Sequence, residues 1–371
     1  MNPHGHVESV IDKQRLARLD ELLEERSLQA VWFAQKNTFA WLTGGSNAVD
    51  HGTDVGVAAV GYDGDGLEVV TSNNEVDRFR SEELPQDVTV HSFDWWTASL
   101  PQAVSDRSPT PAAADFDVPG LESVDASALR QPLTERDLDL ARPMGTDAAV
   151  AMESVCRELT AETTEREAAA LVHREFVDAG FTVPVALIGG EERSLKHRHF
   201  TPTDSRLGGY AIVTAGVERH GMCDSITRLV AFDPPEWLAE RHAVTSRVHA
   251  TAIAATQEAG QNGGTAGDVF EAIREAYSEL GHEGEWQNHH QGGGAGFAMR
   301  EYIAAPESDA EVTLPMTFAW NPTLPGAKNE DTVLVTETDA TVLTRTDEWP
   351  QSSYSAVGYD FDIELNDVLH I

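Results

Sequence analysis

Two hydrophobic segments enclose polar residues in the stretch FAWNPTLPGAKNEDTVLV, residues 318–335. The apolar ends of this stretch predict two strands. Asn321 and Glu330 stand next to those strands. Because a buried polar side chain needs a hydrogen-bond partner or a water molecule, the stretch is either satisfied structure or part of a functional site.

Histidines mark two further places in the chain. There are fourteen in 371 residues, which is many for this length. His197 and His199 stand in KHRHFTPT, residues 196–203, and His289 and His290 precede the glycines of residues 292–294. Glycines beside polar residues let the backbone approach a ligand closely. These histidines therefore belong either to a site or to solvated loops.

The periodicity of the first part of the chain predicts an α/β unit. A helix over residues 16–23 precedes strands at 30–34, 55–61 and 67–71. Residues 105–119 are rich in Pro, Ala, Ser and Asp with little periodicity, which predicts a long surface loop or the approach to a domain boundary. We place that boundary near residue 137, and the length of the chain agrees with about two domains.

The second part predicts helices and strands in alternation. Thr164 and Glu167 have the spacing of a capping box, and Gly180 ends the helix that they begin. The other expected elements are helices at 236–259 and 266–280 and strands at 184–188, 210–215, 222–232, 311–320, 332–336 and 340–345.

The order of these pieces resembles that of the pita-bread family, which includes methionine aminopeptidase, aminopeptidase P, prolidase and creatinase. The matching stretches are His199-Phe200-Thr201-Pro202-Thr203, residues 215–228, His290 with Gly293, Asn321-Pro322 and Glu330-Asp331. The resemblance implies an α/β (α+β) fold with a creatinase-like N-terminal domain at 1–137, a pita-bread domain at 138–348 and a C-terminal extension at 349–371.

The metal enzymes of this family hold two divalent ions with two Asp, one His and two Glu. Carried onto this chain, the positions are Thr214, Ser225, His290, Asn321 and Glu330. Three of the five lack a carboxylate, and neutral oxygens do not balance the charge of two hard cations. The resemblance therefore implies a lost two-metal centre and no cofactor. The alternative is one divalent metal recruited by Asp224, His290 and Glu330, which needs a bulge to turn Asp224 inward.

Creatinase resembles this fold with the metal site emptied and a histidine used for proton transfer. The matching residue here is His199, which suits an acid and base near neutral pH. His290 and Glu330 complete the expected catalytic set, and the expected substrate-binding residues are Thr214, Ser225, Asn321, His289 and Arg228. The resemblance further implies that six residues converge in one pocket between the halves of the pita-bread domain: His199, Thr214, Ser225, His290, Asn321 and Glu330.

Three functions remain open. The first is a metal-independent hydrolase that cleaves a C–N bond of a small amide, guanidino compound or short peptide. The second is an Xaa-Pro peptidase of the prolidase or aminopeptidase P type with a recruited metal. The third is an inactive protein that binds a small molecule or a partner in the emptied pocket.

The net charge indicates which partners are disfavoured and in what kind of cytosol the protein works. The 26 basic and 62 acidic residues give a net charge of −36, which disfavours nucleic acid and anionic membranes. Such an acidic surface suits a very salty cytosol, where self-repulsion is screened. Residues 1–20 lack the apolar stretch of a secretion signal, and Cys156 and Cys223 form no disulfide framework. We expect a halophilic, cytoplasmic homodimer, the dimer being implied by the resemblance to creatinase and prolidase.

Overall fold

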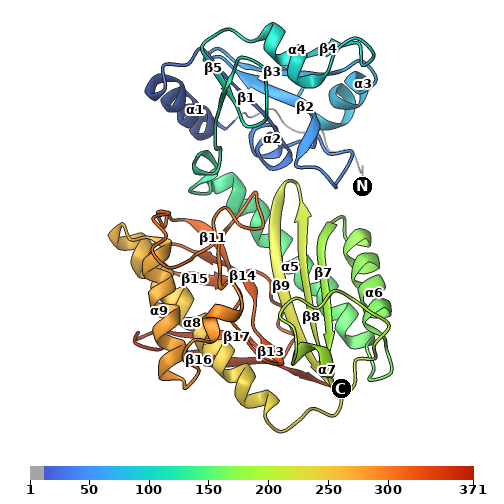
Figure 1. Cartoon of the computed structure of the whole chain (residues 1–371), viewed down its shortest axis with the longest axis vertical. Coiled ribbons are helices and arrows are strands. Elements are labelled where there is room, and N and C mark those ends of the chain that lie inside the picture. Colours follow the sequence, from blue (N-terminus) through green and yellow to red (C-terminus); the bar gives the residue numbers. More distant parts are fainter. Residues whose placement is uncertain (1–11) are drawn as a thin grey trace. The chain divides into compact units, whose positions relative to one another are not determined.

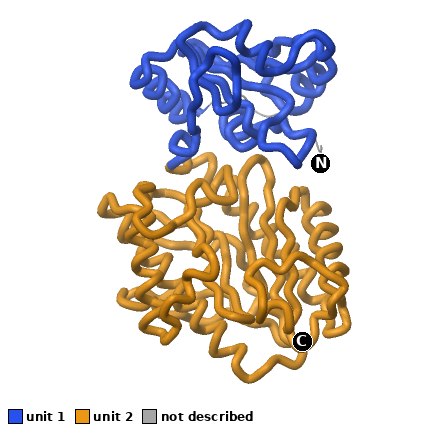
Figure 2. Tube along the Cα trace, viewed as in Figure 1, with its two compact units in different colours: residues 1–131 blue, residues 132–371 orange. Residues whose placement is uncertain are grey.

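The computed structural model describes residues 12–371. The chain divides into two compact units, Met1–Gln131 and Pro132–Ile371 (Figure 2). The first eleven residues, part of the segment inspected for a secretion signal, lie outside the described residues. The division precedes the expected boundary at residue 137, which lies inside the first helix of the second unit.

The first unit is built on a mixed sheet in the order β4-β3-β2-β1-β5-β6 (Figure 1). Its strands are β1 (Ala30–Gln35), β2 (Val55–Tyr62), β3 (Leu67–Ser72), β4 (Thr89–Phe93), β5 (Ala112–Ala114) and β6 (Glu122–Ser123). Its helices are α1 (Lys13–Glu25), α2 (Lys36–Thr43), α3 (Val76–Arg78) and α4 (Leu100–Arg107). Trp32, Val70 and Val104 pack in its core, which joins α4 to the sheet.

The segment at 105–119 differs from the loop that its composition predicts. It contains the end of α4 and the buried strand β5, which pairs in parallel with β1 and with β6. The three alanines of β5 carry no period-2 contrast because both faces of this strand are covered. Composition therefore hid an interior strand of the sheet.

The first half of the second unit places helices against an antiparallel sheet. The helices are α5 (Glu135–Glu158), α6 (Glu165–Asp178) and the short α7 (Glu191–Ser194), and the strands are β7 (Thr182–Gly190), β8 (Tyr210–Arg219) and β9 (Met222–Ala231). The expected capping box begins α6, since Thr164 and Glu167 each accept from the other's backbone N–H. In Figure 1, α5 packs against β9 and α6 against β7.

A two-residue turn joins β8 to β9. His220 and Gly221 have φ of 55° and 78°, and the flanking Arg219 and Met222 are paired. Positive φ at both central residues is the geometry that lets two antiparallel strands twist together without splaying. The turn sets the register that pairs Thr214 with Thr227.

The second half of this unit repeats the arrangement of helices beside a sheet. Its helices are α8 (Leu238–Asn262) and α9 (Ala266–Glu279), which pack on each other. The sheet has the order β10-β11-β14-β15, and β12 pairs with β13. The bounds are β10 (Gly292–Ala295), β11 (Met316–Trp320), β12 (Thr323–Leu324), β13 (Ala327–Lys328), β14 (Asp331–Val335) and β15 (Ala340–Val342).

Residues 349–371 belong to this second unit and complete it. β16 (Gln351–Ser355) and β17 (Asp362–Asn366) form a hairpin, and β18 (Leu369–His370) pairs in parallel with β9. The segment expected as a separate extension therefore supplies an edge strand to the sheet β18-β9-β8-β7.

Two further observations concern the cysteines and the apolar character of the helices. Cys156 and Cys223 are both free and buried. Among residues 12–371, no helix combines the length and the apolar character that a membrane span requires.

Candidate functional site

A pocket of about 180 Å³ lies where the two halves of the second unit meet. The halves join along β9 and β14, since Thr227 N–H donates to the Glu330 carbonyl and Ser225 N–H to Thr332 Oγ1, both at 2.9 Å. The six residues expected to converge all line this pocket: His199, Thr214, Ser225, His290, Asn321 and Glu330. Their expected convergence is confirmed.

Strand alternation brings the hydroxyl groups to the pocket. Ser225 and Thr227 lie two residues apart on β9, so their side chains share one face of the sheet. Thr214 on β8 bonds to Thr227 with an Oγ1–Oγ1 distance of 2.8 Å, and Thr227 Oγ1 donates to Glu330 Oε2 at 2.9 Å. The hydroxyls of Thr214 and Thr227 thus form a hydrogen-bonded chain that ends on the Glu330 carboxylate.

Two cations hold the carboxylate of Glu330. Lys328 Nζ lies 2.7 Å from Oε2, and Arg300 Nη2 donates to Oε1 at 2.9 Å. Burial by itself raises the pKa of Glu330, but Lys328 and Arg300 outweigh it and lower that pKa to about 2. Glu330 therefore stays ionised and transfers no proton near neutral pH.

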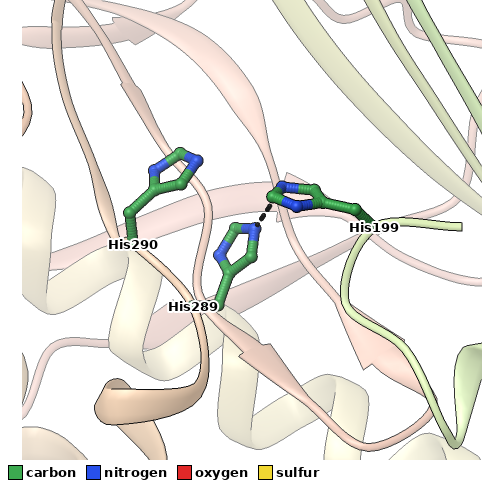
Figure 3. Close-up of side chains that lie close together, drawn as sticks. All are labelled: His199, His289 and His290. Atoms are coloured by element: carbon green, nitrogen blue, oxygen red, sulfur yellow. Dashed lines mark hydrogen bonds between the residues drawn. The ribbon is translucent and has the colours of Figure 1, made fainter.

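Three imidazoles lie close together (Figure 3). Two of them, His199 and His290, line the same pocket as the ion cluster. The Nε2 atoms of His199 and His289 are 3.2 Å apart, and the rings of His289 and His290 are stacked with centroids at 4.4 Å. His199 is exposed toward the pocket, whereas His289 is buried. The Nδ1 atoms of His289 and His290 are buried without a hydrogen-bond partner among the described residues.

The three imidazoles are neutral at pH 7. Burial, followed by the charge of Lys328, lowers the pKa of His199 below its ordinary value, and the same two causes lower that of His289 to about 2. Burial and then Arg300 lower the pKa of His290 to about 4. Each ring therefore keeps a lone pair for accepting a proton or binding a metal.

His289 takes a different place from the expected one. It lies behind His199 and contacts that ring, and it is not among the described residues that line the pocket. A role in positioning His199 therefore fits His289 better than direct substrate binding.

Arg228 corrects the expected set of substrate-binding residues. It is one residue after Thr227 on β9, so its side chain leaves the sheet on the opposite face. Its guanidinium is fully buried, forms an ion pair with Asp331 at 2.9 Å and donates to the Thr344 carbonyl. Arg228 therefore stabilises the fold around β14 and is closed to substrate.

Asp224 faces away from the pocket on the regular strand β9. It is 3% exposed, its Oδ2 has no partner among the described residues, and burial raises its pKa to about 7. No bulge turns it inward, since the pairing of β8 with β9 is continuous from Tyr210 to Arg219. The ligand set Asp224, His290 and Glu330 is therefore not assembled.

The residues around Glu330 do not fit two divalent ions. Thr214, Ser225 and Asn321 offer neutral oxygens, and both oxygens of Glu330 are already engaged by Lys328 and Arg300. A divalent cation placed there would meet two positive charges and one carboxylate. Within residues 12–371, the one group of three metal-binding side chains is His199, His289 and His290, whose nitrogens lie within 4.8 Å of one another.

The sequence analysis missed two charged residues of the pocket, Lys328 and Arg300. Lys328 carried a signal, because it lies two residues before Glu330 and is one of four lysines in the chain. Residues so spaced on an extended segment point to the same side. Arg300 carried none, because a loop after β10 brings it to Ser225 and Glu330.

The part of the chain that matches a known protein family lies in the second unit. The model of metallopeptidase family M24 matches residues 141–337, just over half of the 371 residues. The Xaa-Pro dipeptidase of Pyrococcus furiosus is 23% identical over 355 residues, which cover 90% of this chain and 99% of that protein.

Solved structures match the whole architecture. The prolidase of Pyrococcus horikoshii superposes with a TM-score of 0.73 at 19% identity, covering 90% of this chain and 99% of its own. The dipeptidase PepE of Mycobacterium ulcerans superposes with a TM-score of 0.74 at 19% identity, covering 99% of this chain and 100% of its own. The expected pita-bread fold in a two-part α/β architecture is therefore confirmed.

Proposed function

Because the chain belongs to metallopeptidase family M24, we propose that it hydrolyses a C–N bond of a small amide, guanidino compound or short peptide with its own side chains. One observation carries this proposal. The neutral imidazole of His199 is exposed to the pocket, while the carboxylate of Glu330 is neutralised by Lys328 and Arg300. The group free to move a proton is thus a histidine.

His199 would act first as base and then as acid. Its imidazole takes a proton from water while the water oxygen attacks the carbon of the C–N bond. The imidazolium then returns the proton to the departing nitrogen, and the C–N bond breaks. His289 supports both steps by holding the His199 ring through the 3.2 Å contact between their Nε2 atoms.

Other groups around the pocket favour the charge that develops during attack. The ammonium of Lys328 and the side-chain amide of Asn321 line the same cavity as His199. A donor aimed at an oxygen that gains negative charge lowers the barrier, most strongly where water is scarce. Glu330 holds Lys328 in place for this task through their 2.7 Å ion pair.

The test is the variant His199→Gln, with His197→Gln as its matched control. His197 is exposed two residues away and is not among the described residues of the pocket. We expect His199→Gln to lower turnover about a hundredfold or more, the usual scale of acid-base catalysis, and His197→Gln to leave turnover unchanged. Hydrolysis is followed by amine release from a panel of amides, guanidino compounds and dipeptides in molar potassium chloride.

The pH profile gives an independent measure. Since the pKa of His199 is lowered, we expect kcat/KM to stay constant above pH 6.5 and to fall only below it. Equal turnover by His199→Gln and the unchanged chain would contradict the role of His199.

A second candidate is a metal-dependent Xaa-Pro dipeptidase. It is favoured by the three imidazoles, whose nitrogens lie within 4.8 Å of one another, and by the similarity to the Xaa-Pro dipeptidase of Pyrococcus furiosus. Imidazole suits Zn, Co and Ni, and three protein ligands leave a position open as in catalytic zinc sites. In this reading His199, His289 and His290 replace the expected set that contained Asp224.

Metal analysis separates the two candidates. The chain is purified without added ions and titrated with Co²⁺, whose visible absorption reports a tetrahedral nitrogen site. The first candidate predicts no tight Co²⁺ binding and turnover that survives chelators. Stoichiometric Co²⁺ binding that His289→Asn abolishes, with chelator-sensitive turnover, would establish the second.

A further inference from the structure

The pocket carries a surplus positive charge. Lys328 and Arg300 contribute two positive charges against the one negative charge of Glu330, with which both form ion pairs. Arg228 and Asp331 neutralise each other on the far side of β9 and β14. A chain with a net charge of −36 thus encloses a small cavity of the opposite sign.

These two cations have donors left over. The residue Lys328 is 4% exposed, and Glu330 is the one ion-pair partner recorded for its ammonium among residues 12–371. An ammonium has three N–H donors. Arg300 Nη1 donates to Ser225 Oγ at 3.0 Å and to the carbonyl of Met299, but its Nε is buried without a partner within the described chain.

A buried surplus cation is costly unless an anion or a polar group meets it. Water can satisfy the N–H groups but does not balance the charge. A carboxylate does both, because its two oxygens accept several hydrogen bonds and it carries one negative charge. The surplus here is one positive charge, so one carboxylate makes the pocket neutral.

We propose that the pocket binds the carboxylate of its ligand against Lys328 and Arg300. This binding stands apart from turnover, so it is tested whether or not the proposed hydrolysis takes place. Asn321 fits the same ligand, since its buried Oδ1 has no partner among the described residues and can accept an amide N–H. A cavity of about 180 Å³ is smaller than the ~300 Å³ of common drug-sized sites, which limits the ligand to a few groups.

The test compares two probes of similar size, N-acetylglycine, which ends in a carboxylate, and N-acetylglycinamide, which ends in a neutral amide. Their binding to the full chain is measured by calorimetry in potassium chloride from low to molar concentration. We expect the carboxylate to bind about tenfold or more tightly than the amide, since hydrogen bonds to charged groups are worth about 1.5–3 kcal/mol and tenfold is 1.4 kcal/mol. The same preference is expected in His199→Gln, where the ligand is not consumed.

Lys328→Met supplies the variant and Lys13→Met the matched control. Both remove one positive charge from the chain, but Lys13 is exposed on α1 of the first unit. The preference for the carboxylate should fall to about twofold or less in Lys328→Met and persist in Lys13→Met. Circular dichroism checks whether Lys328→Met keeps its fold. If the variant unfolds, the difference in affinity between the two probes for the unchanged chain still tests the proposal.

The outcomes separate this inference from the proposed function. Equal affinity for the two probes at every salt concentration overturns the inference, and so does a carboxylate preference that Lys328→Met keeps in a folded protein. A carboxylate preference in a chain that hydrolyses no compound of the panel supports the inference and contradicts the proposed function.

Discussion

Glu330 illustrates how a single residue takes its chemistry from its neighbours. Its carboxylate is 3% exposed, yet Lys328 and Arg300 keep it ionised. Glu330 is therefore the counter-ion of two side-chain cations, Lys328 and Arg300. Thr214 and Ser225, which stand where the family resemblance implies metal ligands, carry hydroxyls, so the pocket is polar there.

Asp224 offers the clearest prediction at this scale, through the variant Asp224→Asn. Burial raises the pKa of Asp224 from 3.8 to about 7, so the folded chain binds a proton that the unfolded chain has lost. Stability from this group is therefore present below pH 3.8 and lost as the pH rises to 7. We expect Asp224→Asn to remove this loss, which makes the variant at least as stable as the unchanged chain at pH 8.

Urea unfolding at constant salt between pH 4 and 8 measures the effect. Asp362→Asn, which removes one exposed carboxylate from β17, is the matched control for the loss of a negative charge. A large loss of stability or of hydrolysis in Asp224→Asn would instead show that its carboxylate is needed, as the rejected ligand set requires.

At the scale of elements, the second unit depends on close contact between α5 and the segment after β15. Gly145 lies inside α5, and a Cβ placed there would come within 2.6 Å of Leu343 Cβ and 2.8 Å of the Leu343 carbonyl. Replacing glycine by alanine inside a helix ordinarily stabilises it by about 1 kcal/mol. Here the close contact with Leu343 makes the same replacement destabilising.

We expect Gly145→Ala to lower the free energy of unfolding by about 1–3 kcal/mol, the usual cost of overpacking. Thr146→Ala is the matched control, because it adds the same residue to the exposed side of the same helix and should change stability by less than about 0.5 kcal/mol. Urea unfolding measures both. A gain in stability for Gly145→Ala would mean that α5 can move away from Leu343.

Elements were predictable where one local signal decided them. The capping box that begins α6 is such a case, because Thr164 and Glu167 are three residues apart in the sequence. Strand β5 and residues 349–371 were not predictable, because partners distant in sequence make them part of a sheet. The same holds for the site. The family resemblance predicted that His199 and Glu330 converge, but no local pattern predicted that Arg300 reaches Glu330.

At the scale of the whole molecule, the net charge of −36 sets the expected response to salt. Self-repulsion opposes the compact state, and dissolved ions screen it over about 10 Å at 0.1 M and 3 Å at 1 M. We therefore expect the melting temperature to rise as potassium chloride increases from low to molar concentration. Circular dichroism measures it, and a melting temperature that is flat or falls over this range would contradict the halophilic interpretation.

The expected homodimer stays a prediction.

The parallel pairing of β18 with β9 affects how the protein is made. Translation delivers β9, which ends at residue 231, more than a hundred residues before β18 begins at residue 369. The first unit's sheet needs nothing beyond residue 123, so it can close while the ribosome is still working. Until β18 is synthesised, the end of β9 that it pairs with has no partner strand there. An unpaired strand edge can pair with a strand of another chain. Pairing of one nascent chain with another along this edge is thus the hazard that this topology creates, and Leu369 and His370 remove it when they pair with β9.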